Sequence, residues 1–264
     1  MQLLKSEENY FFQFKALNRF DGLTHLIGCR TGGISQPPFD SMNLSQNVGD
    51  DPQSVAANRR RLWQMTGEGI HIYTRQNHGT AIRTITRRAI QSGQTILTES
   101  EPADALITDL PGIRLLILTA DCQAVMLFDP LNRVVANIHC GWRGSVANII
   151  GETVLRMRSE FGCYPGQMLA AIGPSLGPCC AEFVNYKQEI PIHLWPFRVG
   201  SNHFDFWRIS RHQLVSAGLL NGNVHAAGMC TRCNPHLFYS YRAARKTGRF
   251  AALIGMNAYI ASGK

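Results

Sequence analysis

The chain has 264 residues, of which 45% are hydrophobic and 17% charged, a composition that excludes a disordered or fibrous protein. Its net charge is +8, but the basic residues are scattered rather than striped, which argues against nucleic-acid binding and suits an enzyme for phosphate or nucleotide substrates. The apolar runs stay shorter than 18 residues, and the first eight residues lack a basic start followed by an apolar stretch. We therefore expect no membrane span and a cytoplasmic location.

The first part of the chain predicts a strand, a glycine turn and a helix. Residues 23–29 form an apolar run that ends at Arg30-Thr-Gly-Gly-Ile-Ser, a turn that permits positive φ and close backbone approach. A helix is expected over residues 52–66, with Asp51 as its cap, Pro52 at its first position and Gly67 after its end. The arginine run at 59–61 is interpreted as the solvated face of this helix.

The next pattern places a histidine in a turn. Strands are expected around residues 70–75 and 81–87, and His78 lies between them in Gln-Asn-His-Gly-Thr. A histidine in a glycine-containing turn between strands is poorly placed for core packing, so His78 is a candidate ligand or catalytic group.

The middle of the chain predicts a hairpin. Apolar runs at 115–128 and 133–139 flank an Asp-Pro-x-Asn turn. With residues 130–132 as the loop, Cys122 and His139 fall nearly opposite each other, and cross-strand neighbours lie within about 5.5 Å. A register slip of one residue would put them side by side instead, so the pattern predicts proximity and leaves orientation open.

His78, Cys122 and His139 together predict a metal site. Taken singly, the cysteine reads as a small buried hydrophobe and the histidine as a satisfied core residue. As a set, two imidazoles and one thiolate suit Zn²⁺ and leave a fourth position open for water or substrate. Cu²⁺ is compatible with the same ligands.

Directly after His139, the chain predicts an amphipathic helix beside this metal site. Ser145 is the expected cap, and the apolar positions that follow it are Val146, Ile149, Ile150, Val154 and Met157. Free amides at the helix start and the guanidinium of Arg143 would then bind phosphate. The alternative is that Trp142 belongs to the core and Arg143 pairs with a carboxylate.

The last third of the chain contains most of the remaining cysteines. Residues 168–173 predict a strand that runs into a Gly/Pro loop, and residues 181–184 are expected to begin a helix next to Cys179 and Cys180. Such a position would lower a thiol pKa, although packing explains the pair equally well. The eight cysteines read as thiols or ligands rather than as a disulfide framework.

A zinc ribbon and several common enzyme classes are not expected. The sequence has one Cys-x-x-Cys, at Cys230 and Cys233, and no second pair to complete four ligands. Dinucleotide-binding, P-loop and Gly-x-Ser-x-Gly motifs are absent, as are the His-x-His pairs of multinuclear copper oxidases and the motifs of zinc nucleobase deaminases. A final strand pair is expected at 237–242 and 247–255, with Arg242 as an anion contact and Arg249 as mostly structural.

Nine short motifs in order resemble the laccase-domain or polyphenol oxidase family, also described as purine nucleoside phosphorylases and as a peptidoglycan editing factor. The resemblance covers nearly the whole chain and is carried by Arg30-Thr-Gly-Gly-Ile-Ser, Met42-Asn-Leu-Ser, Val48-Gly-Asp-Asp-Pro, Gln76-Asn-His-Gly, Ala103-Asp-Ala-Leu, Thr119-Ala-Asp-Cys, His139-Cys-Gly-Trp-Arg-Gly, Ile172-Gly-Pro-Ser-Leu-Gly-Pro-Cys-Cys-Ala-Glu-Phe and Phe238-Tyr-Ser-Tyr-Arg. The sequence departs from the family pattern at Asn77, where an aliphatic residue is common, and at Cys140, where Ala or Thr is usual.

The resemblance implies a single α/β (α+β) domain over residues 1–264, a layered sandwich with β-sheets flanked by helices. It also implies that His78, Cys122 and His139 hold zinc, and that the substrates are purine nucleosides and phosphate. The implied activities are phosphorolysis of adenosine, inosine and methylthioadenosine, and deamination of adenosine.

The resulting hypothesis is a zinc-dependent purine nucleoside enzyme. A zinc-bound water with a pKa of about 7 would supply the nucleophile for deamination. Arg143, Ser145 and Arg242 would position phosphate for phosphorolysis. Three further roles are weaker: Asp121 as general acid, and Arg30 and Asn43 as substrate contacts.

Three rival functions remain open from the sequence. One is phenol oxidation by bound copper, and another is a metal-free cysteine hydrolase with Cys122 as nucleophile and His139 as base. The third is a noncatalytic factor that binds cell-wall material or nucleic acid.

Overall fold

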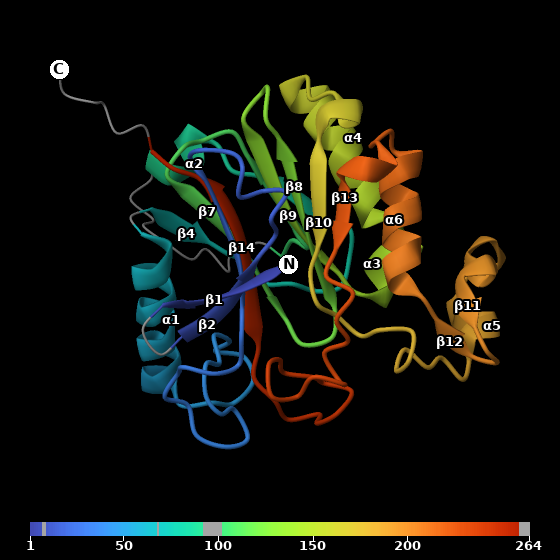
Figure 1. The fold of residues 1–264 in the computed structure, drawn as a ribbon, viewed down its shortest axis with the longest axis horizontal. Helices are drawn as coiled ribbons and strands as arrows, with labels where there is room; N and C mark the ends of the chain where they lie inside the picture. Colours follow the sequence, from blue (N-terminus) through green and yellow to red (C-terminus); the bar gives the residue numbers. More distant parts are fainter. Residues whose placement is uncertain (7–8, 68, 92–101, 259–264) are drawn as a thin grey trace.

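Two mixed sheets stack face to face between layers of helices (Figure 1). A computed structural model of the protein describes residues 1–6, 9–67, 69–91 and 102–258. The strands of the first sheet are, in spatial order, β1 (Gln2–Ser6), β2 (Asn9–Gln13), β3 (Leu23–Gly28), β14 (Phe250–Met256), β7 (Ile113–Thr119) and β4 (Ile70–Ile72). Those of the second are β13 (Val224–Ala226), β10 (Leu169–Ile172), β8 (Gln123–Asp129), β9 (Val134–Cys140), β6 (Ala105–Thr108) and β5 (Ile82–Thr84).

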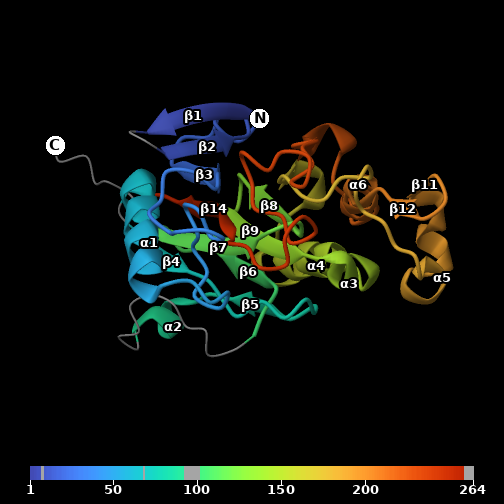
Figure 2. The ribbon, with the colours of Figure 1, turned by 90° about the horizontal axis from the view of Figure 1, so that it is seen from below.

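Helix α1 (Pro52–Thr66) covers the outer face of the first sheet, and α3 (Trp142–Val146), α4 (Ile149–Phe161) and α6 (Phe206–Ser216) cover that of the second. The other helices are α2 (Arg87–Gln91) and α5 (Tyr186–Glu189), with 3₁₀ turns at Pro165–Gln167, Ile192–Phe197 and Asn221–Asn223. A two-stranded ribbon of β11 (Arg198–Val199) and β12 (His203–Phe204) extends with α5 beyond α6 (Figure 2). No helix in the described ranges has the length and apolar character needed to cross a bilayer.

The central core lies between the two sheets. Ile117 of β7 and Leu115 meet Met126 and Val135 of the second sheet there, and all four are fully buried. On the outer face of the first sheet, Leu62 of α1 packs in a separate cluster, while α4 and α6 close the outer face of the second sheet. The expected layered α/β sandwich with helices on its faces is confirmed.

Helix α1 agrees with its sequence signals. The carboxylate of Asp51 accepts hydrogen bonds from the amides of Gln53 and Ser54, and the helix ends before Gly67, whose φ is 71°. The interpretation of 59–61 as a solvated face is wrong for Arg59, which is buried and stacks 4.5 Å over the ring of Tyr73. Its Nε donates to the carbonyl of Leu44 at 2.9 Å, so α1 directs this cation inward.

The helix expected to start at Ser145 is instead two helices. Gly141 is the N-cap of α3, and after α3 the chain passes through Asn148, whose φ of 56° breaks the helix and whose side chain caps α4. Ser145 is therefore an interior residue of α3 and is not a cap. The apolar positions predicted for one continuous helix are split across this break, but both helices still pack on the second sheet.

Two other local predictions are wrong. Residues 181–184 form no helix, because the chain there pairs with the 202–204 segment through Phe183 N–H to Asn202 O (2.8 Å) and Phe204 N–H to Ala181 O (3.1 Å). Residues 237–242 are a loop rather than a strand, and β14 pairs with β3 and β7 instead.

Candidate active site

The donor atoms of His78, Cys122 and His139 all lie within 4.8 Å of one another. The two imidazole rings meet edge to face, with centroids 4.8 Å apart and planes at 82°. His139 is almost fully buried, Cys122 is partly buried, and His78 is exposed. The sequence reasoning that these three residues lie close together therefore agrees with the geometry.

The register of the hairpin differs from the expected one. Strands β8 and β9 pair Ala124 with His139 and Gln123 with Cys140, so Cys122 lies just before β8 and diagonal to His139. Asp121, with a φ of 89°, turns the chain at this point. The thiol reaches the imidazole because the backbone bends at the start of β8.

His78 reaches the site from a segment that crosses between the sheets. The strands predicted on either side of it do form, but β4 belongs to the first sheet and β5 to the second. The side-chain amide of Gln76 pairs with both backbone groups of Leu118, at 2.9 Å and 2.8 Å, which fixes the segment to β7. Its other anchor is Asp104.

Asp104 is a fully buried carboxylate that holds His139 and the segment around His78 in place through hydrogen bonds. Its Oδ1 accepts hydrogen bonds from Nδ1 of His139 (2.7 Å) and from the amide of His78 (2.9 Å), and Oδ2 accepts from the amide of Gly79 (2.8 Å). Nδ1 of His139 is therefore engaged, which leaves Nε2 for a ligand. A histidine that binds a metal through one ring nitrogen usually donates the N–H of the other to a carboxylate, a backbone carbonyl or water.

The ionised forms of Cys122, His139 and Asp104 stabilise one another electrostatically. Burial by itself raises the pKa of the Cys122 thiol, but the charge of His139 and hydrogen bonds from both histidines lower it to about 6. Burial by itself lowers the pKa of His139, yet the Cys122 thiolate and Asp104 raise it to about 9. Hydrogen bonds and the charge of His139 likewise hold the pKa of Asp104 below its ordinary value against the effect of burial. Near neutral pH the thiol and the carboxyl are both ionised.

The residues present fit a divalent transition metal. Two imidazole nitrogens and one thiolate match a catalytic zinc donor set that leaves one position open. Gly141 preserves the space, since a Cβ there would lie 3.0 Å from Cδ2 of His78 and 3.1 Å from Sγ of Cys122. A side chain at this position would intrude on the side chains that would hold an ion.

A cavity of about 750 Å³ opens onto these three residues. Its cationic wall consists of Arg59, Arg75, Arg143, Arg242, Arg245 and Arg249. Its aromatic residues are Tyr73, Trp142, Phe183, Phe206 and Tyr241. Among the described residues that line it, Asp121 is the sole carboxylate. The loops around residues 30–50 and 238–249 gather at the end of the sandwich where this cavity lies (Figure 1).

Asp121 uses both carboxylate oxygens to hold a neighbouring loop. Oδ1 accepts from Oγ1 of Thr231 and Oδ2 from the amide of Arg242, each at 2.6 Å. The guanidinium of Arg242 donates to the carbonyl of Glu182 at 3.1 Å while lining the cavity. Asp121 thus positions Arg242, a role better supported by these contacts than that of a proton donor.

The other expected phosphate contacts differ in their placement. Arg143 is exposed, lines the cavity and stacks 4.5 Å over the ring of Trp142. Ser145 is buried outside the cavity wall, with its Oγ 3.1 Å from Sγ of Cys140. Burial raises the pKa of Cys140 to about 12, and its thiol faces Ser145 rather than the cluster of His78 and its partners.

Arg30 and Asn43 lie outside the cavity wall. The Arg30 guanidinium binds Asp40 at 3.0 Å and stacks 4.8 Å over Tyr239. Asn43 is fully buried, and its Oδ1 accepts from the amide of Arg249 at 2.9 Å. Both residues fix loops around the cavity, and neither has a side chain in its lining.

Comparison with known proteins identifies the family. The model of the family described as multi-copper polyphenol oxidoreductase laccase matches residues 24–257. The chain belongs to this laccase-like family.

Members of the laccase-like family resemble the chain over almost its full length. Purine nucleoside phosphorylase YlmD of Geobacillus stearothermophilus is 32% identical over 89% of this chain and 91% of the relative. Purine nucleoside phosphorylase YfiH of Escherichia coli is 30% identical over 88% of this chain and 93% of the relative. The crystal structure of YlmD from Geobacillus stearothermophilus superposes with a TM-score of 0.85 at 29% identity, covering 97% of this chain and 98% of that one.

Within this laccase-like chain, sequence reasoning missed several residues of the site. Asp104 follows Ala103 directly before a buried strand, and a lone carboxylate inside such an apolar run was its signal. Arg59 was assigned to solvent and Arg249 to a structural role, yet both line the cavity. Arg59 lies in α1 within a run of three arginines, and Arg249 lies in a loop, so neither position has a local signal that points to a shared wall.

Proposed function

We propose that this protein is a zinc-dependent purine nucleoside phosphorylase. The observation that carries the proposal is one cavity that joins the donor set of His78, Cys122 and His139 to an arginine-rich and aromatic wall. The names of the relatives, purine nucleoside phosphorylases of several bacteria, point to the same reaction class.

The wall of the cavity supports the two substrates. Arginine binds phosphate through planar, charge-assisted hydrogen bonds, and Arg143, Arg242 and Arg249 are proposed for this role. Tyr241 and Trp142 offer flat apolar surfaces for stacking against a purine. In the described part of the chain, six arginines and a single carboxylate line the cavity, so its positive potential favours an anionic co-substrate beside a neutral purine ring.

The proposed reaction joins a phosphate oxygen to C1′ of the ribose while the bond from C1′ to the purine breaks. The arginines hold the phosphate against C1′, and the aromatic residues hold the departing base. The ion held by His78, Cys122 and His139 would supply Lewis acidity that polarises the substrate. Asp104 keeps the imidazole of His139 in one orientation through Nδ1.

We extend the proposal to adenosine, inosine and methylthioadenosine as phosphorolysis substrates, and to adenosine deamination. Deamination replaces the 6-amino group of the base, which leaves as ammonia, by oxygen from water and needs no phosphate. The two reactions therefore separate by phosphate dependence.

Product analysis tests the proposed function. Purified protein is incubated with adenosine, with and without phosphate, and the products are identified by mass spectrometry. Adenine and ribose 1-phosphate that form only with phosphate support phosphorolysis, and inosine that forms without it supports deamination. Absence of all three from a zinc-loaded, folded protein contradicts both, and favours a binding factor.

A cysteine hydrolase is the second candidate, favoured by the alignment of Cys122, His139 and Asp104. Their hydrogen bonds and opposite charges match a nucleophile, a base and an orienting carboxylate. Enzymatic activity of the purified protein that survives complete removal of metal supports the cysteine hydrolase. Activity lost on chelation and restored by Zn²⁺ supports the phosphorylase, whereas restoration by Cu²⁺ alone, with phenol oxidation, supports the oxidase.

A further inference from the structure

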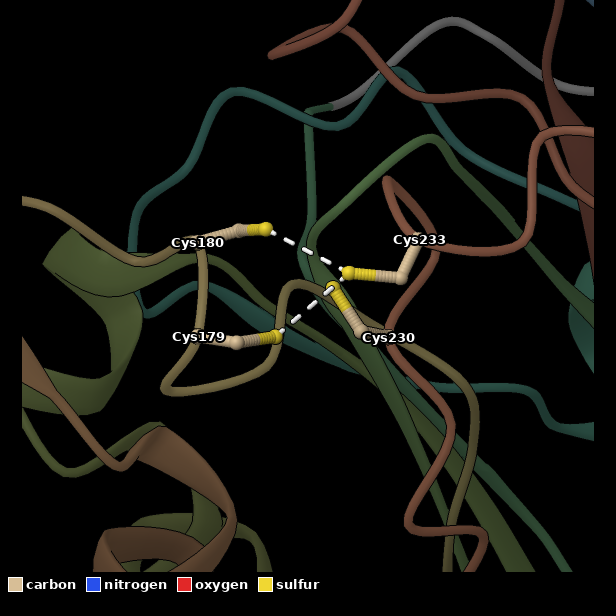
Figure 3. Close-up of side chains that lie close together, drawn as sticks. All are labelled: Cys179, Cys180, Cys230 and Cys233. Atoms are coloured by element: carbon tan, nitrogen blue, oxygen red, sulfur yellow. Dashed lines mark hydrogen bonds between the residues drawn. The ribbon is translucent and has the colours of Figure 1, made fainter.

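Four cysteines outside the cavity gather at one point of the surface (Figure 3). Cys179 and Cys180 come from the loop after β10, and Cys230 and Cys233 from the loop after β13. All four sulfur atoms lie within 4.8 Å of one another. The vicinal pair therefore supplies the two ligands that the single Cys-x-x-Cys lacks in the sequence.

The sulfur spacing fits a shared ion. Sγ of Cys233 lies 3.6 Å from Sγ of Cys179 and 3.6 Å from Sγ of Cys180. In a tetrahedral site with Zn–S bonds of about 2.3 Å, the sulfurs are about 3.8 Å apart. A disulfide needs about 2.05 Å and can join only two of the four.

The backbone brings these two loops together independently of the sulfurs. Strands β10 and β13 are parallel neighbours, and the pairing continues past their ends as a bridge between Ser175 and Cys230. The amide of Thr231 donates to the carbonyl of Ser175 at 3.0 Å. Gly177 permits the close approach, because a Cβ there would lie 3.1 Å from Cβ of Cys230.

The four sulfurs lie at the boundary between the protein interior and solvent. Cys180 and Cys230 are buried, whereas Cys179 and Cys233 reach the surface. An ion can thus enter from solvent and be held partly inside the protein.

We propose that Cys179, Cys180, Cys230 and Cys233 bind one zinc ion, in a site separate from His78, Cys122 and His139. Zinc binding releases the protons of the four thiols to solvent and leaves four Zn–S bonds. Four protein ligands close the coordination sphere, so the ion is structural. This site depends on the fold and not on the proposed phosphorylase activity.

The zinc ion would stabilise a wall of the cavity. Thr231, between the two cysteines of one loop, donates to Asp121 at 2.6 Å, and the amide of Leu176 in the other loop donates to the Asp121 carbonyl at 2.9 Å. Arg242 donates to the carbonyl of Cys180 at 3.4 Å. By joining the two loops, the ion fixes the residues that position Asp121 and Arg242.

Metal counting by mass spectrometry on protein purified under reducing conditions tests the site. We expect about one zinc per chain in Cys122→Ala, held by four sulfurs at about 2.3 Å in zinc X-ray absorption. The double variant Cys179→Ser/Cys233→Ser should lose that signal. If the wild-type protein holds the four-sulfur zinc but no zinc at His78, Cys122 and His139, the proposed function is contradicted and the four-cysteine site is still supported.

A conservative variant guards against a folding artefact. Cys233→His should retain zinc with three sulfurs and one nitrogen, a set common in structural sites. Cys163→Ala, outside both clusters, should keep the zinc content of wild type, while Cys179→Ser/Cys233→Ser should lose the four-sulfur zinc and melt several degrees lower. The proposal is overturned if folded Cys122→Ala holds no four-sulfur zinc, if it holds iron instead, or if peptide mapping finds a disulfide within the four cysteines.

Discussion

Nδ1 of His139 lies 2.7 Å from Oδ1 of Asp104, with both side chains almost fully buried. The same Oδ1 accepts the amide of His78, so one carboxylate orients one imidazole and anchors the segment that carries the other. Two candidate ligands from distant parts of the chain are thereby fixed relative to each other.

Replacing this carboxylate should weaken the site. Asp104→Asn has one oxygen for the donors that now share two, and we expect a loss of roughly 10- to 100-fold in zinc affinity and phosphorolysis. Zinc affinity is measured by competition with a chelator. Asp109→Asn, at an exposed position of the following loop, is the control and should behave as wild type. Unchanged affinity in Asp104→Asn would show that the carboxylate has no role in metal binding.

Gly141→Ala should damage the metal site more than the fold. The new Cβ would be about 3 Å from His78 and Cys122, and overpacking of this kind costs about 1–3 kcal/mol, or roughly 5- to 150-fold in affinity. Gly222→Ala, where no atom lies within 4 Å of the added Cβ, is the matched control. Equal zinc affinity in the two variants would contradict the assignment of this space.

The reactivity of Cys122 should follow its lowered pKa in metal-free protein. Because the pKa of this thiol is about 6, the thiolate predominates above that pH, and alkylation by iodoacetamide should level off above neutrality and fall as the pH drops below 6. Peptide mass spectrometry separates Cys122 from the other cysteines. In His139→Ala the midpoint should move upward, since the main charge that lowers the pKa is gone. A midpoint between 8 and 9 in wild type would refute the ion pair.

Arg143→Gln should impair phosphate binding selectively. A charge-assisted hydrogen bond contributes about 1.5–3 kcal/mol, so the KM for phosphate should rise roughly 10- to 150-fold while the KM for nucleoside changes little. Arg208→Gln removes an exposed arginine outside the cavity and serves as the control. An equal rise in both KM values would point to general damage rather than a phosphate contact.

Tyr241→Ala should impair nucleoside binding and leave phosphate binding nearly unchanged. Stacking of a base on an aromatic ring contributes about 1–3 kcal/mol, which corresponds to a rise of roughly 5- to 150-fold in the KM for nucleoside. The KM for phosphate should stay near its wild-type value. Tyr164→Ala, an exposed tyrosine outside the cavity lining, is the comparison. If Tyr241→Ala binds nucleoside as wild type does, the purine lies elsewhere in the cavity.

Local signals in the sequence were sufficient for some elements. The cap residue Asp51, with Pro52 and Gly67, predicted both ends of α1, because helix ends are encoded by nearby side chains. The turn at 129–132 likewise predicted the hairpin that brings Cys122 and His139 near each other. Its register was off, since the loop spans residues 130–133 rather than 130–132, with Arg133 at a φ of 53° that its residue type does not predict.

The sequence by itself determined the layered class of fold, the family and the closeness of His78, Cys122 and His139, because periodicity, turn residues and ordered motifs are local features. Only the tertiary structure decided the role of Asp104, the inward direction of Arg59 and the gathering of four cysteines. Each of these depends on packing between segments that are distant in the chain, since the first sheet draws strands from both ends of the sequence. Apart from the lone carboxylate at Asp104, such contacts leave no pattern in the residues around any one of them.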